Sequence, residues 1–459
     1  MTLFRKEYDS IGMKEVPADA YYGIQSLRAA ENFRITGTKV HPEMIKAIAE
    51  IKKAAAIANK KAGVIDEKIA DAITQACEEI LRGNFVEYFI VDSIQGGAGT
   101  SLNMNANEVI ANRAIEILGG QKGDYAIVHP NDHVNCGQST NDAYPSAGRI
   151  ASIRLLKSVI KQLEILYNTF MKKAADYSNV IKMGRTEMQD AVPISFGQVF
   201  HAYASAIKRD KERFVLAANE MAKLNMGGTA VGTGINADDK YIKTIVPILA
   251  DITNLPLIQA DDLVDATQNL DSFVYVSSII KSCATTLSKI SNDLRLMSSG
   301  PRTGFAEINL TPKQNGSSIM PGKINPVIPE VMNQICFNVI GNDTTITYAS
   351  EAGQLELNAF EPIIFRCLFE SLDTLCNGVA IFIKDCISEI TVNQIQCKTH
   401  LNRSIGIITA LCPYIGYTRA SHLAKKALSK NRNIRDIVIE ENIMSEEEVD
   451  KLLEPVNMV

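Results

Sequence analysis

The chain has 459 residues, of which 46% are hydrophobic and 22% are charged, and its formal net charge is −5. A chain of this length exceeds what one compact core accommodates, so we expect two or three domains. The slightly negative charge excludes the basic footprint of a protein that binds nucleic acid or anionic membranes. If the ligand is an anion, the positive charge that binds it has to be local.

The cysteine pattern and the N-terminal residues both indicate a cellular compartment. The nine cysteines are scattered, are odd in number and form no Cys-x-x-Cys pair. This is typical of a reducing compartment rather than of a disulfide framework. The N-terminal residues include Arg5, Lys6 and Glu7 and lack the apolar run of a signal peptide. No apolar run approaches the ~20 residues that span a bilayer. We therefore expect a cytoplasmic protein.

The first 140 residues combine short helical patterns with loops and contain two polar stretches. Residues 96–107 read Gly-Gly-Ala-Gly-Thr-Ser-Leu-Asn-Met-Asn-Ala-Asn, which predicts a loop leading into a helix. Residues 129–142 are rich in Asn, Asp, Ser and Gly. His129 and His133 have the spacing of a metal pair on a helix, but Pro130 favours a loop, and we expect no metal there.

Long apolar seams begin after Pro145. One seam runs from Ile153 to Phe170, and a second covers three heptads from Val276 to Met297. The second seam predicts a helix over 271–298, roughly 40 Å long at a rise of 1.5 Å per residue. Such lengths are typical of a long bundle that also packs against other subunits. A buried helix with no partner chain is the alternative.

The remaining chain is also predicted to be helical. Residues 327–395 should be mostly helix, with interruptions near Gly341, Gly353 and Pro362. Shorter amphipathic patterns follow. We therefore expect a mixed, mostly helical N-terminal domain over 1–140, a central helical bundle over 141–395 and a small helical C-terminal domain over 396–459.

Residues 316–326, Gly-Ser-Ser-Ile-Met-Pro-Gly-Lys-Ile-Asn-Pro, form the most informative segment. Gly316 and Gly322 permit backbone conformations that other residues avoid. Pro321 and Pro326 fix φ and break regular structure. An ordinary turn needs neither the second serine nor the lysine. The string therefore predicts a constrained loop that places hydroxyl groups near an anion.

Three other segments concentrate hydroxyls and amides beside a glycine or a helix start. Taken singly, each is explained by helix N-capping, for which Ser, Thr, Asn and Asp are preferred. They are Gly99-Thr100-Ser101, Gln138-Ser139-Thr140-Asn141-Asp142 and Gly184-Arg185-Thr186-Glu187-Met188-Gln189-Asp190.

Together with the 316–326 loop, these segments resemble the fumarase/aspartase superfamily, and the resemblance covers essentially the whole chain. It runs from Asp9-Ser10-Ile11-Gly12 through Asn103-Met104-Asn105 to Asn402-Arg403-Ser404-Ile405-Gly406-Ile407. The resemblance implies a mainly α homotetramer whose subunits each contribute five bundle helices to a twenty-helix core. Each active site would then draw residues from three subunits.

The activity that the resemblance implies is reversible anti elimination of ammonia from L-aspartate to give fumarate, through a dianion with both charges on one carboxylate. Ser317 would act as the base, as an alkoxide. The positions that match the family's substrate-binding residues are Thr100, Ser139, Thr140 and Ser318 around the dianion, Thr186, Lys323 and Asn325 around the other carboxylate, and Asn141. No cofactor or bound metal is implied, and activation by a divalent cation is not readable from the sequence.

Two positions depart from the fumarase pattern. Glu187 stands where fumarases have His and aspartases have His or Gln, and Thr140 stands where fumarases typically have Ser. Both departures favour the elimination of an amine over the elimination of water. Glu187 would hold the substrate ammonium through a charge-assisted contact, or else would tune a neighbouring network around Glu330. The alternatives are a fumarate hydratase, a lyase acting on an N-substituted aspartate, and a non-catalytic helical scaffold.

Overall fold

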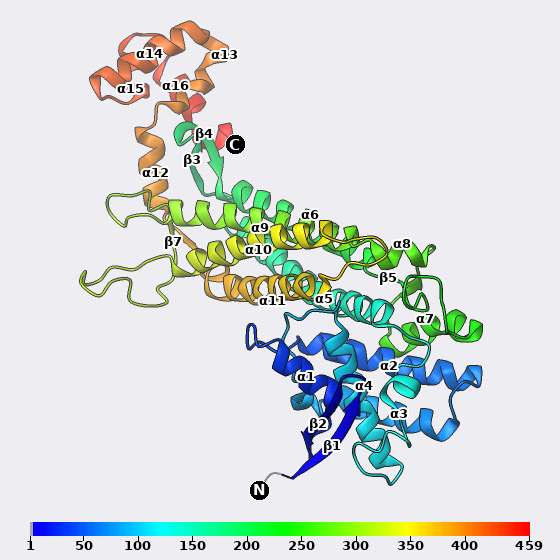
Figure 1. The fold of residues 1–459 in the computed structure, drawn as a ribbon. Coiled ribbons are helices and arrows are strands. Elements are labelled where there is room, and N and C mark those ends of the chain that lie inside the picture. The colour runs from blue at the N-terminus through cyan, green and yellow to red at the C-terminus, as the bar shows by residue number, and fades with distance from the viewer. Residues whose placement is uncertain (1–2) are drawn as a thin grey trace. The chain divides into compact units, whose positions relative to one another are not determined.

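The computed structural model describes residues 3–459 as a mainly α-helical protein (Figure 1). The fold is mainly α, as predicted. The chain forms two compact units, each built from three segments. The first unit comprises the residues up to Ile160, Glu212–Ser282 and Asn338–Thr374, and the second comprises Lys161–Lys211, Cys283–Phe337 and Leu375–Val459. The division into three domains at residues 140 and 395 stays a prediction.

Five long helices have residues in both units. They are α5 (Thr140–Asp176), α6 (Phe196–Glu220), α9 (Asp271–Met297), α10 (Val327–Glu351) and α11 (Glu361–Asp385). Both predicted apolar seams are buried faces of these helices. Ile153 and Phe170 are buried in α5, and Val276, Leu287 and Leu294 are buried in α9. The predicted helix over 271–298 is confirmed to within one residue of its C-terminal end.

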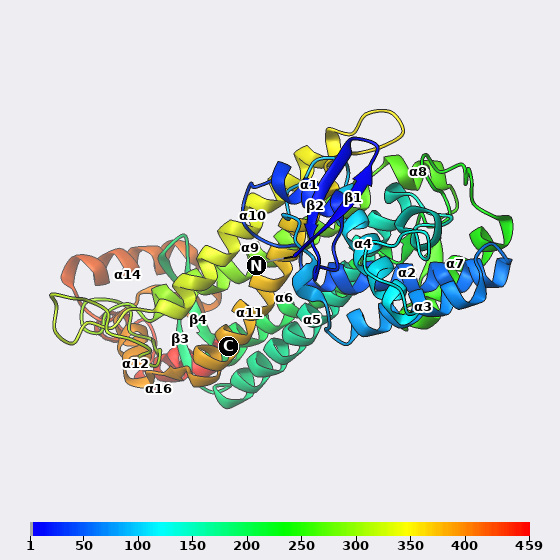
Figure 2. The same cartoon turned by 60° about the horizontal axis from the view of Figure 1, so that its bottom comes forward.

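The rest of the first unit consists of the N-terminal strands and helices and of the elements between α6 and α9. Its elements are β1 (Phe4–Asp9), β2 (Gly12–Pro17), α1 (Ile24–Asn32), α2 (Pro42–Ala62), α3 (Glu67–Leu81), η1 (Val86–Tyr88), α4 (Thr100–Ile117), η2 (Pro130–Val134), β5 (Lys223–Leu224), α7 (Asp239–Thr253), β6 (Ile258–Gln259) and α8 (Leu263–Gln268). Strands β1 and β2 are antiparallel, and β5 and β6 are parallel. Helix α2 packs against α3, α4 and α7 (Figure 2). It begins at Pro42 after the His41 cap and ends at Ala62, and Gly63 follows in the left-handed conformation typical of a helix C-terminus.

The rest of the second unit consists of two small sheets and the C-terminal helices. Its elements are β3 (Ile181–Thr186), β4 (Gln189–Ser195), β7 (Ile308–Asn309), η3 (Ile387–Glu389), β8 (Thr391–Val392), α12 (Gln394–Arg403), η4 (Gly406–Leu411), α13 (Cys412–Ile415), α14 (Tyr417–Lys430), α15 (Ile434–Glu440), α16 (Glu446–Leu453) and η5 (Pro455–Met458). β3 pairs with β4 and β7 with β8, both antiparallel. The C-terminal helices close around their own apolar cluster, which includes Leu411, Leu423 and Ile437.

One expected helix interruption is absent, because α10 continues through Gly341. A single break at residues 352–360 accounts for the interruptions expected near Gly353 and Pro362. Pro362 is the second residue of α11, where a proline fits because its missing N–H has no intrahelical partner. The predicted loop after His129 is instead one π-helical turn, η2, capped by the His129 ring.

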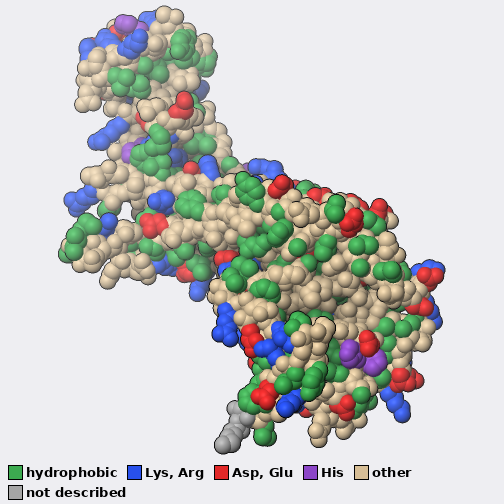
Figure 3. All heavy atoms as spheres, in the orientation of Figure 1, with side chains coloured by type: hydrophobic (Ala, Val, Ile, Leu, Met, Phe, Trp, Pro, Cys, Tyr) green, Lys and Arg blue, Asp and Glu red, His purple; other side chains and the backbone are tan. Residues whose placement is uncertain are grey.

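Acidic and basic side chains are interspersed on the face shown in Figure 3. Within residues 3–459, every helix is either too short or too polar to cross a membrane.

Helix packing predicts a stability effect at Gly148. A Cβ added there would lie 2.0 Å from a carbon of the Phe365 ring, so α5 and α11 would have to separate. Gly148→Ala should lower the free energy of unfolding by about 1–3 kcal/mol, as overpacking does, measured by urea unfolding. Equal stability of the Gly148 variant and the wild type would contradict this packing.

Candidate active site

Thr100 begins α4 directly after a tight turn. Gly99 has a φ of +89°, and a Cβ on it would lie 2.3 Å from the Tyr144 ring, so the turn needs glycine. The exposed Thr100 side chain donates its hydroxyl hydrogen to the Gly97 carbonyl at 2.7 Å. The predicted loop leading into a helix is confirmed, and it presents Thr100 at the helix N-terminus.

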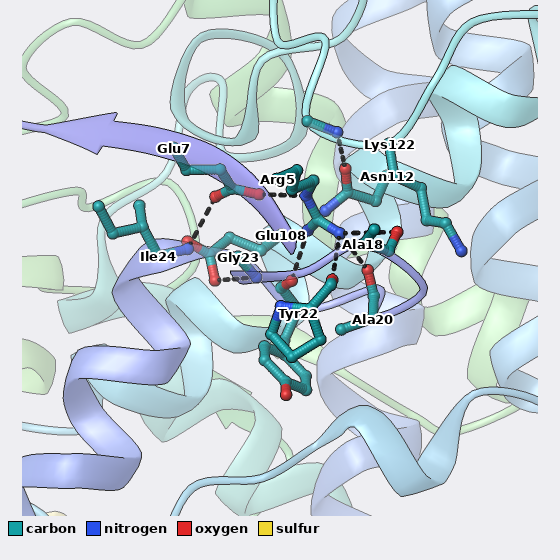
Figure 4. Close-up of polar contacts among 12 residues, drawn as sticks. Arg5, Glu7, Ala18, Ala20, Tyr22, Gly23, Ile24, Glu108, Asn112 and Lys122 are labelled. Atoms are coloured by element: carbon teal, nitrogen blue, oxygen red, sulfur yellow. Dashed lines mark hydrogen bonds and ion pairs between the residues drawn. The ribbon is translucent and has the colours of Figure 1, made fainter. Parts of the chain in front are cut away.

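The helix that carries Thr100 is anchored through Glu108 (Figure 4). This buried carboxylate accepts hydrogen bonds from the backbone N–H groups of Gly23, Gln25 and Ser26 at 2.8–3.0 Å. It therefore caps the N-terminus of α1, where negative charge is favourable. Burial raises the pKa of Glu108 to about 7, while the bonds from Ser26 and Gln25 act in the opposite direction.

Arg5 fixes the segment that precedes α1. Its guanidinium donates to the carbonyl oxygens of Pro17, Ala20 and Tyr22 at 2.8–2.9 Å and pairs with Glu7 at 2.7 Å (Figure 4). Helix α4 is thus tied, through Glu108, to the start of α1, and Arg5 holds the carbonyl groups of the segment that precedes α1.

Ser139 directly precedes α5, Thr140 and Asn141 are the first two residues of α5, and all three are half-buried. The Ser139 hydroxyl accepts the Asn141 N–H at 3.2 Å, which is an N-capping contact. The Asn141 side chain donates to the Ala230 carbonyl at 2.8 Å. The capping explanation therefore holds for Ser139, and the Ser139 hydroxyl hydrogen remains able to donate elsewhere.

The carboxylate of Asp142 holds this turn in place. It accepts the Ser139 N–H at 2.9 Å and the N–H groups of Gly227 and Thr229 at 3.1 Å. Burial raises the pKa of Asp142 to about 6, against the lowering effect of these three hydrogen bonds. Asp142 is a positioning residue that the site prediction from sequence did not include, although it lies inside the quoted polar segment.

Thr186 and Glu187 lie in the second unit, at the tip of the β3–β4 hairpin. Thr186 pairs with Gln189, and the two residues between them, Glu187 and Met188, have φ of +52° and +67°. Such a two-residue turn normally uses Asn or Gly, so it is strained here. Thr186 and Glu187 are exposed and line an open cavity of about 890 Å³. The helix-capping explanation is wrong for this segment, because a hairpin forms instead.

A buried ion cluster holds the base of that hairpin. Glu307, which is fully buried, pairs with Arg185 at 2.6 Å, with Lys182 at 2.9 Å and with His400 of α12 at 3.1 Å. Burial alone would raise the pKa of Glu307, but Lys182 and Arg185 outweigh it and hold this pKa below its usual range. The cluster links β3 to the residue immediately before β7 and to α12.

The 316–326 segment is a loop between β7 and α10, as predicted (Figure 1). The Gly316 N–H donates to the Lys323 carbonyl at 2.9 Å, and Asn325 donates to the Gly316 carbonyl at 2.8 Å, so these contacts close its base. A Cβ on Gly316 would lie 2.6 Å from that Lys323 oxygen, which explains the glycine. Ser318 and Lys323 are exposed.

Ser317 differs from Ser318 in its surroundings. Its half-buried hydroxyl oxygen accepts the N–H groups of Ile319 at 3.2 Å and Met320 at 3.0 Å. These two hydrogen bonds are typical of a serine that stabilises a turn. The same two donors would also favour the deprotonated form of the hydroxyl.

The ten predicted site residues therefore divide between the two units. Ser139, Thr140 and Asn141 lie together at the start of α5, and Thr100 lies in the same unit. The six others lie in the second unit, two on a hairpin tip and four in one loop; they are Thr186, Glu187, Ser317, Ser318, Lys323 and Asn325.

Comparison with known proteins identifies the family. The family described as Lyase matches residues 12–341, and the one described as Fumarase C C-terminus matches residues 407–459. The chain is 52% identical to the aspartate ammonia-lyase of Bacillus subtilis, over 99% of this chain and 96% of the relative, and 45% identical to that of Escherichia coli, over 99% and 96%.

Solved structures agree with this relationship. A fumarate lyase:delta crystallin from Brucella melitensis, bound to cobalt, superposes with a TM-score of 0.97 at 45% identity, covering 99% of both chains. A class II fumarase from Schistosoma mansoni gives 0.96 at 33% identity, again over 99% of both. The fold and these matches define a lyase. The chain belongs to the fumarase/aspartase family.

The ion cluster predicts a pH-dependent stability effect. Glu307→Gln leaves Lys182 and Arg185 without their buried counter-charge, so the free energy of unfolding should fall by about 3–5 kcal/mol at neutral pH. The folded-state pKa of Glu307 lies below its usual value of 4.5. The stability that Glu307 contributes is therefore complete above pH 4.5 and is lost as the pH falls through the lowered pKa. Urea unfolding at several pH values measures it.

The control for this prediction is an exposed ion pair. Lys172 pairs with Asp176 at 2.7 Å on the surface of α5. Lys172→Met should change stability by less than about 0.5 kcal/mol. A Glu307→Gln loss as small as that of the control would contradict a stabilising cluster.

Proposed function

We propose that this protein is an aspartate ammonia-lyase, which converts L-aspartate to fumarate and ammonia by reversible anti elimination. The observation that carries the proposal is the 52% identity to the Bacillus subtilis aspartate ammonia-lyase across nearly the whole chain, against 33% to the Schistosoma mansoni fumarase. Thr140 and Glu187, which both depart from the fumarase pattern, also favour an amine.

The chemical difficulty is the removal of a proton from the carbon next to a carboxylate. The resulting dianion has to be stabilised by donors that are already in place, and each such donor is worth ~10²–10³ in rate. Lys323 supplies the main positive charge for a substrate with two anionic groups. The hydroxyls and amides proposed to surround the substrate are those of Thr100, Ser139, Thr140, Asn141, Thr186, Ser318 and Asn325.

Ser317 is proposed as the base. An unassisted serine is too weak an acid to form an alkoxide at neutral pH. The N–H groups of Ile319 and Met320 support this role, since both donate to the Ser317 oxygen and would stabilise its negative charge. Closure of the loop over the substrate, with Gly316 and Gly322 as hinges, would exclude water.

Glu187 is proposed as the ligand of the substrate ammonium. Its exposed carboxylate lies at a hairpin tip beside Thr186 and lines an open cavity. A carboxylate–ammonium contact is charge-assisted and stronger than a neutral hydrogen bond. It would also favour L-aspartate over L-malate, which has a hydroxyl in place of the amine.

The assembly proposed is a homotetramer with a twenty-helix core and active sites shared by three subunits. Large apolar side chains on the long helices support it. Phe337 and Tyr348 on α10 are 62% and 70% exposed, and Tyr275 on α9 is 45% exposed. An exposed apolar surface of this kind is typical of a protein–protein interface. The cytoplasmic location stays a prediction.

The ultraviolet absorbance of fumarate provides the direct test of the activity. The purified protein is incubated separately with L-aspartate, with L-malate and with an N-substituted aspartate. Of these three compounds, only L-aspartate is expected to give fumarate. Formation from L-malate would identify a fumarase, formation from the substituted aspartate a related lyase, and formation from none of them a scaffold.

Ser317→Ala tests the base. The variant should bind L-aspartate with nearly unchanged affinity, measured by calorimetry, but should lose at least ~10³ in kcat, because general base catalysis contributes up to about 10⁴-fold and the alkoxide is also the only strong base proposed. Ser429→Ala, a serine on α14, should behave as wild type. Near-normal turnover of the Ser317 variant would rule out the assignment.

Glu187→Gln tests the ammonium ligand. Loss of a charge-assisted hydrogen bond worth about 1.5–3 kcal/mol should raise the KM for L-aspartate about tenfold or more. The KM for fumarate in the reverse reaction is the internal control and should stay the same, since fumarate has no amine. Unchanged affinity for L-aspartate would remove this role from Glu187.

A further inference from the structure

Lys52 is a buried lysine without a carboxylate in contact. It lies in the middle of α2 and is 0% exposed. Its ammonium donates to the side-chain oxygens of Asn135 at 2.8 Å and Gln138 at 2.9 Å. Both of these hydrogen-bond partners, within the described part of the chain, are neutral amides. A buried charge that lacks an ionic partner is costly, so its retention calls for an explanation.

The charge of Lys52 sets the orientation of the amides around it. An ammonium group donates and cannot accept, so Asn135 has to present its oxygen. The amide nitrogens of Asn103 and Asn107 in α4 then donate to that same oxygen, at 3.1 and 3.2 Å. One lysine thereby fixes the direction of three asparagine side chains.

The orientation continues from Asn103 to Thr140. The amide nitrogen of Asn103 also donates to the Thr140 hydroxyl oxygen, at 3.1 Å. Because the Thr140 oxygen accepts this hydrogen bond from Asn103, the single hydroxyl hydrogen of Thr140 is left to donate to another group. If the Asn103 amide were reversed, its oxygen would take this hydrogen and turn the hydroxyl inward.

The observed orientation leaves an acceptor unused. The Oδ1 atom of Asn103 is buried and has no hydrogen-bond partner among the residues that the structure describes, and the same is true of Asn107. Buried polar atoms are nearly always paired. Asn103 is therefore held in the orientation that serves Lys52, Asn135 and Thr140, at the expense of its own oxygen.

We propose that Lys52 is a positioning residue for the lyase reaction: through Asn135 and Asn103 it holds the Thr140 hydroxyl as a hydrogen-bond donor for the substrate carboxylate. This rests on the proposed function, because it requires Thr140 to contact the substrate. Burial lowers the pKa of Lys52 to about 7, and the carboxylate of Asp142 acts in the opposite direction.

Three variants separate this role from a general effect on folding. Lys52→Met keeps a side chain of similar size without a donor. Asn103→Asp keeps the shape of Asn103 but accepts the Thr140 hydrogen instead of donating to Thr140. Lys53→Met is the matched control, since this neighbouring lysine on α2 pairs with Glu78 at 2.8 Å, outside the network.

Each variant is assayed for fumarate formation from L-aspartate, alone and combined with Thr140→Val. Lys52→Met and Asn103→Asp should each lower kcat/KM at least about tenfold, less than the ~10² expected on removing a donor outright. Added to Thr140→Val, neither should cause a comparable further loss, because both act through that hydroxyl. Lys53→Met should match the wild type.

A purely structural role would give a different pattern. If a variant only reduces the folded fraction, which circular dichroism measures, its loss of kcat/KM multiplies with that of Thr140→Val. If Lys52→Met folds poorly, Asn103→Asp is the variant that separates the positioning role from the structural one. Wild-type kcat/KM in Asn103→Asp, or losses that multiply with that of Thr140→Val, would overturn the proposal. Absence of wild-type activity on L-aspartate would instead overturn the proposed function.

Discussion

Burial of the apolar faces of long helices is the constraint on which the other features of this protein depend. Each fully buried Leu, Ile or Phe contributes about 1.5–3 kcal/mol, so the seams of α5 and α9 hold these helices in the core. Every candidate site segment adjoins such a helix. Thr100 begins α4, Thr140 begins α5, the β3–β4 hairpin precedes α6, and the 316–326 loop precedes α10. The helices therefore position the polar groups, and the polar segments contribute little to the cores.

Buried charged groups then set the local geometry, because each has to find partners away from water. Glu108 ties α4 to α1, Asp142 holds the first turn of α5, and Glu307 holds the hairpin below Thr186. In each case an ionisable side chain contacts a candidate segment, or the helix or strand that carries it, and orients it through backbone or ionic contacts. Lys52 extends the same arrangement to a single hydroxyl, with amides as intermediates. Orientation of this kind is what an enzyme needs if its donors are to meet charge that develops during the reaction.

The sequence predicted what depends on local periodicity and missed what depends on tertiary contacts. The seam from Val276 to Met297 predicted α9 closely because burial and period coincide. Gly341 was expected to interrupt a helix, but a lone glycine costs only about 1 kcal/mol, which packing overrides. The β3–β4 hairpin was missed, since its turn, Glu187-Met188, lacks the usual Asn or Gly. Lys52 carried a readable signal, a lysine on the apolar stripe of α2 with Ile48 and Ala55, but its partners are distant in sequence.

The proposed sharing of each active site between subunits is the least local of these features, and it can be measured directly. Ser317→Ala and Thr140→Val alter different units of the chain, and each should be nearly inactive alone. When the two are co-expressed, hybrid tetramers should contain sites in which both residues are intact, supplied by different subunits. Fumarate formation from L-aspartate well above that of either variant is the predicted result. Activity no higher than the average of the two variants would contradict a site built from more than one subunit.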